Sequence, residues 1–244
     1  MTMAAMRHWP LPDTHNVRDL GGYARKSGGN TQWGRLLRGE ALHPLSQDSI
    51  DHLVAQNLAL VIDLRGPHET GHTQHPFRDH AGVAYRNIPL FDVLSPIAMA
   101  KPPFDMTQRY RDALDKCGPR LAEVFRAIIT ASPGVILFHC TAGKDRTGIV
   151  AALLLLLAGV ERNDVAEDYA LTAAAAGLIA PLRARALAAG GEPDHVDRML
   201  ASDAATMLAM LDHLDVRHGG IHRYLAEIGL APGDVDKLRD RLCA

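Results

Sequence analysis

The fold of this chain is decided by one stretch, Val135-Ile136-Leu137-Phe138-His139-Cys140-Thr141-Ala142-Gly143-Lys144-Asp145-Arg146-Thr147-Gly148. Its first four residues are apolar and follow Pro133-Gly134, which predicts a short buried strand. Residues 149–158 form an unbroken run rich in Ala and Leu, which predicts a buried helix. The residues between them therefore form a tight loop from strand to helix, with the thiol of Cys140 at its entrance.

The loop that begins at Cys140 is suited to bind an oxyanion. A loop wound around a helix N-terminus directs several backbone N–H groups to one point, and the helix dipole adds positive potential there. Gly143 permits a sharp turn of the backbone, and the planar guanidinium of Arg146 can bind two phosphate oxygens. The same field stabilises a thiolate. The sequence thus predicts a phosphate cradle whose nucleophile, Cys140, would form a phosphocysteine intermediate.

Two neighbouring side chains support the loop in this interpretation. Thr147 can donate a hydrogen bond to the sulfur, and His139 is expected to brace the loop backbone rather than to transfer protons. No second cysteine or histidine falls at ligand spacing around Cys140, which argues against a zinc site. The Gly-x4-Gly-Lys pattern of a nucleotide-binding loop is also absent. We therefore expect neither a metal nor an organic cofactor.

The stretch from His139 to Gly148 resembles the active-site loop of the cysteine-dependent protein tyrosine phosphatase superfamily. The full string HCTAGKDRTG resembles that of a bacterial branch, the tyrosine/lipid phosphatases with Ala-Gly-Lys-Asp inside the loop. Residues 16–22, Asn-Val-Arg-Asp-Leu-Gly-Gly, are similar to the N-terminal motif of this branch, and residues 220–230 to its closing helical segment. The resemblance therefore spans nearly the whole chain.

This resemblance implies a fold and an activity. The fold is α/β, with a central, mostly parallel sheet flanked by helices and a helical C-terminal insert or lid. The activity is phosphoric monoester hydrolysis by a protein tyrosine phosphatase acting through a phosphocysteine intermediate, with a phosphoinositide or dual-specificity (Ser/Thr/Tyr) phosphatase as the alternative. The substrate would be a phosphotyrosine protein or a phosphoinositide. Its phosphate would be bound by Thr141, Ala142, Gly143, Lys144, Asp145 and Arg146.

Cleavage of a phosphate ester needs a general acid at the leaving oxygen, and Asp145 is the leading candidate. The bacterial branch has an aspartate at this position, and a thiolate and a phosphate dianion nearby favour a protonated carboxyl. The alternative is that Asp145 only hydrogen-bonds the loop backbone. Asp63, at the end of a predicted strand, ranks second, and Asp92, after another, ranks third.

The segment around Asp63 carries further candidates. Strand ends in open α/β sheets face the ligand crevice, and the resemblance places this Asp-Leu-Arg element beside the active site. Asp63 is expected to orient water or Arg146, and Arg65 to bind substrate or to pair with Glu69. A purely structural salt bridge at the strand end is an equal alternative.

Lys144 is expected to add a second cation at the rim of the loop. Extra positive charge there favours polyanionic head groups such as those of phosphoinositides. A solvated lysine without this function is the alternative, because lysine side chains are usually exposed.

Length and composition fit one large α/β domain over residues 1–244. Hydrophobic residues make up 47% of the chain, enough for a substantial core, and the formal net charge is −2. No global basic field would thus attract nucleic acid or an anionic membrane. No apolar run approaches the roughly 20 residues of a transmembrane helix, so we expect no stable membrane insertion, and the oligomeric state stays open.

The three cysteines, Cys117, Cys140 and Cys243, provide no disulfide framework, which suits a reducing compartment. The first eleven residues lack the apolar core of a signal peptide. We expect a cytoplasmic protein, with leaderless secretion as the alternative.

Periodicity and turn signals predict the other elements. His68, His72 and His75 are expected in a surface loop rather than at a zinc site, and residues 91–103, rich in proline, in a loop over the site. The helical insert at about 163–190 is read equally as a lid or as a packing layer. Strands are expected at 33–38, 59–64 and 83–90, and helices at 46–56 (capped by Ser46), 106–117, 119–131, 163–174, 177–189, from 193 onward and from 232 onward.

Overall fold

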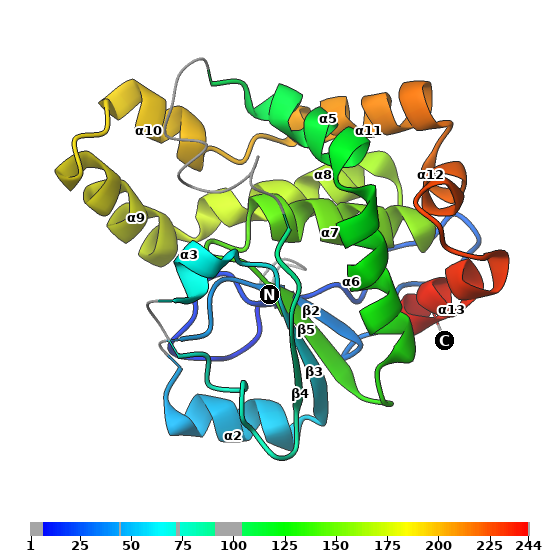
Figure 1. Ribbon diagram of the computed structural model, residues 1–244, viewed down its shortest axis with the longest axis horizontal. Helices are drawn as coiled ribbons and strands as arrows, with labels where there is room; N and C mark the ends of the chain where they lie inside the picture. Colours follow the sequence, from blue (N-terminus) through cyan, green and yellow to red (C-terminus); the bar gives the residue numbers. More distant parts are fainter. Residues whose placement is uncertain (1–6, 44, 72–73, 91–103, 244) are drawn as a thin grey trace.

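The computed structural model describes residues 7–43, 45–71, 74–90 and 104–243, and its centre is a five-stranded sheet flanked by helices (Figure 1). β1 pairs antiparallel with β2, and the other pairs are parallel, in the order β1-β2-β5-β3-β4. The prediction of an α/β fold with a mostly parallel sheet is thus confirmed. The strands are β1 (Arg18–Asp19), β2 (Leu36–Gly39), β3 (Leu58–Asp63), β4 (Ala84–Asn87) and β5 (Val135–His139).

The four parallel strands end in one row. Gly39 of β2 is paired with His139 of β5, His139 with Asp63 of β3, and Asp63 with Asn87 of β4. The carboxyl ends of parallel strands form the edge where open α/β sheets bind ligands. The loop that carries Cys140 leaves the sheet at the middle of this row.

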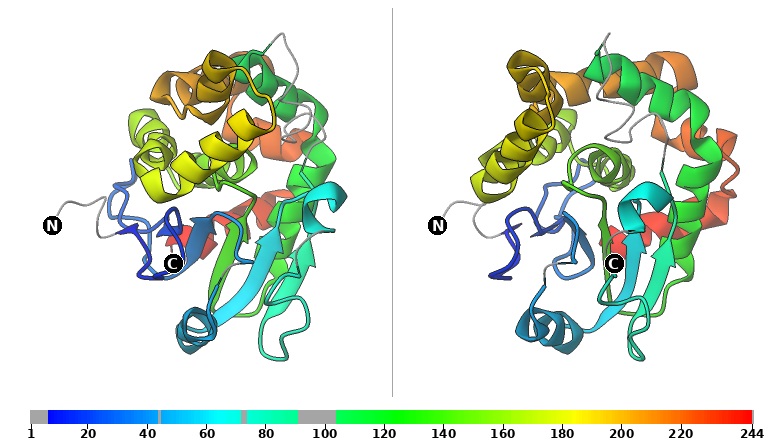
Figure 2. Two further views of the ribbon diagram at one scale, coloured as in Figure 1. Left: turned by 90° about the vertical axis from the view of Figure 1, so that its left-hand side faces the viewer. Right: turned by 60° about the vertical axis from the view of Figure 1, so that its left-hand side comes forward.

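Both faces of the central strands are buried, which explains their continuous apolar runs. Leu36, Ile136 and Phe138 enter the larger apolar cluster, with residues of α6 (Gly118–Thr130) and α7 (Asp145–Leu157). Leu37 and Leu137 enter the smaller cluster on the opposite face, with Leu53 of α2 (Gln47–Ala55). Figure 2 shows α2 on one side of the sheet and the larger helical layer on the other.

Helix α7 is the centre of the helical layer, and twelve of its thirteen residues are buried. It begins at Asp145, four residues before the predicted start, because the end of the loop already has helical geometry. The helices packed against it include α8 (Arg162–Ala170), α12 (Ile221–Glu227) and α13 (Pro232–Cys243). The N-terminus of this largely buried helix is thereby fixed at the carboxyl edge of the sheet.

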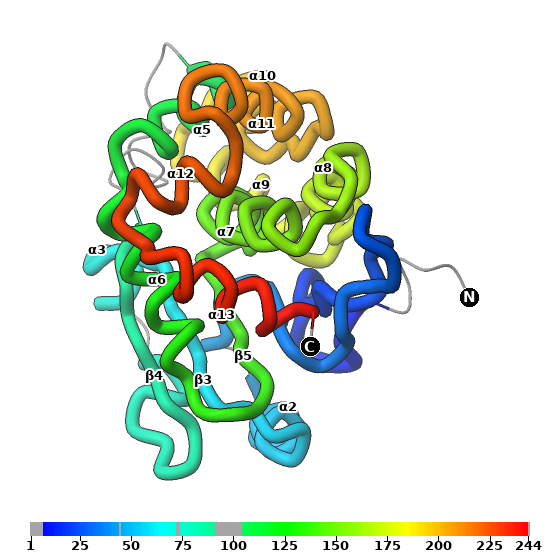
Figure 3. The backbone as a smooth tube through the Cα atoms, turned by 90° about the vertical axis from the view of Figure 1, so that its right-hand side faces the viewer, coloured from blue at the N-terminus to red at the C-terminus, as the bar shows by residue number. Residues whose placement is uncertain are grey.

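The other predicted helices are present within one or two residues of their expected bounds, except that the helix expected at 163–174 ends at Ala170 and continues as a 3-10 turn. Ser46 caps α2 by accepting a hydrogen bond from the Ser49 N–H. The segment 91–103, with Asp92, and His72 lie outside the described residues. The remaining helices, traced in Figure 3, are α3 (Pro67–Thr70), α5 (Met106–Lys116), the 3-10 turn η1 (Leu171–Ala174), α9 (Ala176–Ala188), α10 (Pro193–Leu200) and α11 (Ala204–His218).

The expected insert at 163–190 divides into two parts. Helix α8 is a packing layer, with Val165, Ala166, Asp168 and Tyr169 buried. Helix α9 has no buried residue, and with α10 it forms a hairpin that stands apart from the helices covering the sheet (Figures 1 and 2). The separate helical unit therefore spans residues 176–200, not 163–190.

Across the described residues, no single helix has the length and apolar character needed to cross a membrane. One bent pair, Arg162–Ala174 with Ala176–Ala188, meets those two criteria jointly, with a bend of 65° between its halves.

Candidate active site

The loop after β5 has the sharp turn predicted for it at Gly143. Cys140 follows β5 directly and is 2% exposed, and Gly143 has φ +67°. A Cβ at Gly143 would lie 2.6 Å from the backbone carbon and oxygen of Gly39. Only glycine fits there, because both the backbone conformation and the space exclude a side chain.

Four consecutive carbonyl groups of this loop are held from outside it. Each accepts a hydrogen bond from a donor in another segment or from the strand before the loop. The donors are His139 Nδ1 to Cys140 O (3.0 Å), Ala41 N to Thr141 O (3.0 Å), Asn16 Nδ2 to Ala142 O (2.8 Å) and Arg38 Nη2 to Gly143 O (2.6 Å).

These anchors determine where the amide groups of the loop point. In a trans peptide, the C=O of one residue and the N–H of the next lie on opposite sides of the plane. The N–H groups of residues 141–144 are therefore turned away from the anchors, towards the concave side of the loop. None of the four donates to an acceptor among the described residues. Together with the N-terminus of α7, they offer unpartnered donors of the kind that bind anions, which makes this loop the candidate anion site.

Arg146 is oriented by the carboxylate of Glu69, which was expected to pair with Arg65 if Arg65 did not bind substrate. Arg146 Nη1 and Nη2 donate to Glu69 Oε2 and Oε1 at 2.5 and 2.7 Å, and the hydroxyl of Thr141 donates to the same carboxylate. Arg146 Nε is buried and has no hydrogen-bond partner in the described part of the chain. Glu69 thus fixes the guanidinium and leaves its Nε–H available to a bound oxyanion.

The pairing proposed between Arg65 and Glu69 is absent from the described hydrogen bonds. Arg65 instead donates from Nε and Nη2 to Asp63, whereas Glu69 accepts from Arg146, Thr141 and the Gly66 N–H. Burial opposes ionisation of Glu69, but the bonds and charge of Arg146 hold the pKa of this carboxyl below its ordinary value. Glu69 is therefore an anionic clamp on the loop.

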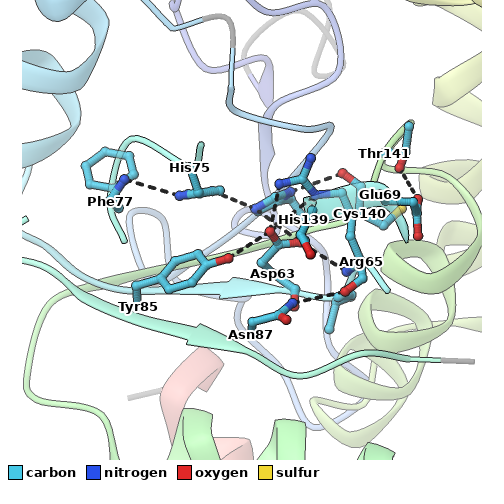
Figure 4. Close-up of polar contacts among 12 residues, drawn as sticks. Asp63, Arg65, Glu69, His75, Phe77, Tyr85, Asn87, His139, Cys140 and Thr141 are labelled. Atoms are coloured by element: carbon cyan, nitrogen blue, oxygen red, sulfur yellow. Dashed lines mark hydrogen bonds and ion pairs between the residues drawn. The ribbon is translucent and has the colours of Figure 1, made fainter. Parts of the chain in front are cut away.

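Asp63 lies at the end of β3 with a fully buried carboxylate (Figure 4). It accepts from Arg65 and from the Tyr85 hydroxyl (3.0 Å), and it makes no hydrogen bond to Arg146 among the described residues. Burial opposes its ionisation, but nearby His139 and the bonds from Arg65 lower the pKa of Asp63. Its described contacts are those of a structural ion pair, and Glu69 is the residue that orients Arg146.

His75, expected on the surface, is buried and contacts His139. His75 Nδ1 accepts from the Phe77 N–H (3.2 Å), so its proton lies on Nε2, which faces His139 Nε2 at 3.0 Å. His139 must then carry its own proton on Nδ1, which donates to the Cys140 carbonyl. Burial lowers the pKa of both rings, that of His75 to about 3. Through this hydrogen bond His139 holds the loop backbone, which is the role expected for it from the sequence.

The Asp63, His75 and His139 ligand atoms lie within 4.8 Å of one another. Each ring nitrogen of the two histidines already has a hydrogen-bonding role in the chain described above. The hydrogen bonds therefore account for this group without a metal.

The anchors of the loop are themselves held by buried charges. Asp168 of α8 accepts from Arg38 Nη1, from Arg18 Nε (3.2 Å) and from the Tyr23 hydroxyl (2.9 Å). Glu40 accepts from the Asn16 backbone N–H at 2.9 Å. The motif at 16–22 and strand β2 thus hold the loop from the side opposite to Glu69.

Asp145 is the first residue of α7 and is 7% exposed. Its Oδ1 accepts from the Tyr110 hydroxyl of α5 (2.7 Å), and Tyr110 in turn lies 2.9 Å from the Tyr169 hydroxyl. Burial and the charge of Asp145 raise the pKa of Tyr110 well above its ordinary value, so Tyr110 remains a hydrogen-bond donor. Asp145 Oδ2 makes no hydrogen bond to any described residue, which leaves it available to substrate.

Lys144 was predicted to add a second cation at the rim of the loop, but the structure buries its side chain. The side chain is 2% exposed, and its Nζ donates to the carbonyls of Met199 and Ala201 at the end of α10 and lies 3.3 Å from Asp145 Oδ1. A cation is favoured at the C-terminus of a helix. Lys144 thus ties the loop to the α9–α10 hairpin, and its charge is not presented to solvent.

The Thr147 hydroxyl is buried and has no hydrogen-bond partner in the described part of the chain, the Cys140 sulfur included. Several contacts of the site were not predicted from the sequence, although an arginine within the apolar strand β2 could have indicated one of them. Arg38, Tyr110 and Asp168 were not named as site residues, and Asn16, Glu69 and His75 were named without the contacts described above.

We expect Asn16→Ala to weaken anion binding by releasing the Ala142 carbonyl. A lost hydrogen bond to a buried group costs roughly 1–3 kcal/mol, and about 1.4 kcal/mol corresponds to a factor of ten in affinity. The dissociation constant for vanadate should therefore rise about tenfold, measured by titration of the purified protein. Asn163→Ala, on the exposed surface of α8, is the matched control. Unchanged affinity in Asn16→Ala would show that the carbonyl needs no anchor.

The low pKa of His75 predicts a loss of stability in acid. Between the ordinary value of 6.5 and about 3, the unfolded chain binds a proton at this ring that the folded chain excludes. The free energy of unfolding therefore falls as pH falls below 6.5, by up to about 1.4 kcal/mol per pH unit and proton. Urea unfolding at several pH values gives the free energy of unfolding as a function of pH. Below pH 6.5 this free energy should change less steeply with pH for His75→Gln than for the parent or for His222→Gln, and equal pH dependence would contradict the assignment.

Comparison with known proteins identifies the family of this chain. A model described as the tyrosine phosphatase family matches residues 9–244. A tyrosine-protein phosphatase of Nostoc commune is 31% identical over 216 residues, 85% of this chain and 74% of the relative. A putative tyrosine-protein phosphatase of Cupriavidus necator is 34% identical over 63% of this chain and 59% of its own length.

A further relative is the triple specificity protein phosphatase PtpB of Mycobacterium tuberculosis, 28% identical over 55% of this chain and 53% of that protein. Crystal structures of P. aeruginosa TpbA, one of them a complex with pTyr, are 15% and 16% identical over 68% and 72% of this chain and 85% of theirs, with a TM-score of 0.36. Because the family model covers the sheet, the Cys140 loop and the helical layer, the chain belongs to the tyrosine phosphatase family.

Proposed function

We propose that this enzyme hydrolyses phosphotyrosine through a phosphocysteine intermediate on Cys140. One observation carries the proposal: the carbonyls of residues 140–143 are all held by hydrogen bonds, which turns the N–H groups of residues 141–144 to the other side of the loop. A phosphoryl group bound by these amides and by Arg146 has its phosphorus in line with the sulfur. Preorganised donors of this kind stabilise the charge that develops on equatorial oxygens.

In the first step, the Cys140 thiolate attacks phosphorus as the bond to the leaving oxygen breaks. Asp145 gives its proton to that oxygen, which leaves as the free tyrosine hydroxyl. Tyr110 holds Asp145 Oδ1, so Oδ2 is the oxygen from which the proton is transferred. In the second step, the Asp145 carboxylate takes a proton from water, the resulting hydroxide attacks phosphorus, and the S–P bond breaks to release inorganic phosphate and the thiolate.

The substrate class follows from the depth of the site. The sulfur is almost fully buried, as are Lys144 and Asp145, so a substrate must extend its phosphate well beyond its own backbone. An aryl phosphate does this better than the shorter side chains of phosphoserine or phosphothreonine. Phosphoinositides were favoured by a second cation at the rim of the loop. The ammonium of Lys144 instead donates to the carbonyls of Met199 and Ala201, which supports phosphotyrosine as the first substrate to test.

Cys140→Ser should abolish turnover of phosphotyrosine peptides and still bind inorganic phosphate, because the amides and Arg146 remain. In the parent protein, mass spectrometry after an acid quench should find the phosphoryl group on the peptide that contains Cys140. Residual turnover by Cys140→Ser at the parent rate would overturn the assigned nucleophile. Cys243→Ser is the control for a general effect of removing a thiol.

Asp145→Asn should lower kcat by about 10²- to 10⁴-fold for esters with a poor leaving group, the range expected for general acid catalysis. For an activated ester such as 2,4-dinitrophenyl phosphate, the loss should be much smaller, because its leaving group departs without a proton. Comparison of kcat for both esters measures the effect.

The other two candidate acids, Asp63 and Asp92, are the controls for this measurement. Asp63→Asn and Asp92→Asn should leave the ratio of the two kcat values at the parent level, even where they lower stability. If the ratio changes for Asp63→Asn or Asp92→Asn and not for Asp145→Asn, the proton comes from the rival carboxyl.

A further inference from the structure

We propose that Asp115, His213 and His218 form a binding site for a divalent transition-metal ion, Zn²⁺ above all, on the helical layer. His213 Nε2 and His218 Nε2 lie 2.8 and 2.9 Å from the same oxygen, Asp115 Oδ1. The three ligand atoms all lie within 4.8 Å of one another. Asp115 is on α5, and the two histidines are on α11, which lies beside α5 in Figures 1 and 3.

The surroundings of His218 resemble those of a metal ligand. Its Nε2 faces Asp115 and its Nδ1 faces Glu227 Oε2 of α12 at 3.0 Å. In the tautomer with its proton on Nδ1, His218 donates to Glu227 and presents the lone pair of Nε2 towards Asp115. A metal at Nε2 accepts this lone pair and leaves the Nδ1 proton for Glu227. A carboxylate on the second nitrogen is the arrangement that orients metal-bound histidines.

The ligand set selects the class of ion. Two imidazole nitrogens and a carboxylate oxygen suit zinc and its neighbours, whereas Mg²⁺ and Ca²⁺ prefer oxygen ligands alone. At bond lengths of about 2.0–2.1 Å, tetrahedral ligand atoms are about 3.3 Å apart, so Asp115 must move outward by a few tenths of an ångström. Its side chain is 34% exposed and that of His213 20%, which permits this movement and gives the ion access from solvent.

This cluster differs from the buried group Asp63, His75 and His139. There, the Phe77 N–H and the Cys140 carbonyl complete an unbroken chain of hydrogen bonds, and Arg65 occupies the carboxylate. At Asp115, two imidazole rings contact one carboxylate oxygen, and the centroids of the His213 and His218 rings are 5.7 Å apart. Three ligand atoms within 4.8 Å of one another, on two partly exposed side chains and one buried ring, can hold a cation with water as the fourth ligand.

A bound ion would join α5 to α11. Helix α5 also carries Tyr110, which donates a hydrogen bond to Asp145. An ion at Asp115 would therefore fix the other end of α5. Ligands that bind only the folded state stabilise it by mass action. The melting temperature should therefore rise with zinc concentration, and this effect does not depend on catalysis.

The site is tested with metal-free protein in a Cys140→Ser background, because a catalytic thiolate would itself bind zinc. Calorimetric titration with Zn²⁺ should show one ion per chain, and Co²⁺ should give the visible absorption of a tetrahedral site. Asp115→Asn and His213→Gln should lose both signals. Glu227→Gln, which acts through His218, should weaken binding by about 10- to 100-fold.

His222→Gln, an exposed histidine near the same helices, should bind one ion as the parent does. Equal binding by the parent and by the Asp115→Asn, His213→Gln double variant would overturn the site. Loss of binding in His75→Gln alone would place the ion at the buried group instead. Because activity is absent from this background, the result is independent of whether the proposed phosphatase mechanism is correct.

Discussion

The structure depends on the outward orientation of four consecutive carbonyl groups, those of residues 140–143. Convergent N–H dipoles at a helix N-terminus repel one another, and a free loop would turn some of them to other acceptors. Each carbonyl is held by a different donor, from β5, from the segment after β2, from the N-terminal motif and from β2 itself. The anion site is therefore imposed by tertiary structure, and the local sequence of the loop supplies only the turn at Gly143.

The buried charges around the loop are explained by this need for orientation. Arg18 and Arg38 share Asp168, whose burial opposes ionisation while the two cations lower its pKa to about 2. Buried ion pairs seldom stabilise a fold more than apolar side chains of similar size would. They do fix direction: a guanidinium held by a carboxylate at one edge presents its other N–H groups at a defined angle. Arg38, held by Asp168, donates to the Gly143 carbonyl in this way, and Arg146, held by Glu69, keeps its Nε–H free for an oxyanion.

The sequence predicted the features that depend on local pattern. Apolar runs covered on both faces predicted the central strands β3 and β5, Ser46 predicted the start of α2, and the Cys140–Arg146 spacing predicted the loop between β5 and α7. Contacts between distant segments left no periodic signal. Glu69 precedes Arg146 by 77 residues and Tyr110 precedes Asp145 by 35, and no single-chain pattern joins them. Lys144 was misplaced for the same reason, since its partners at the end of α10 are set by how the hairpin folds back.

Lys144 makes the position of Asp145 dependent on two helices. Its ammonium is bound by the last carbonyls of α10 and lies next to Asp145 Oδ1, which Tyr110 of α5 also holds. If the α9–α10 hairpin moved away, the ammonium would lose these partners while still buried, at a cost of several kcal/mol, or it would follow the hairpin and leave Asp145. Either way, the carboxyl would change its surroundings. The hairpin is therefore mechanically coupled to the candidate acid, although none of the α9 residues is buried.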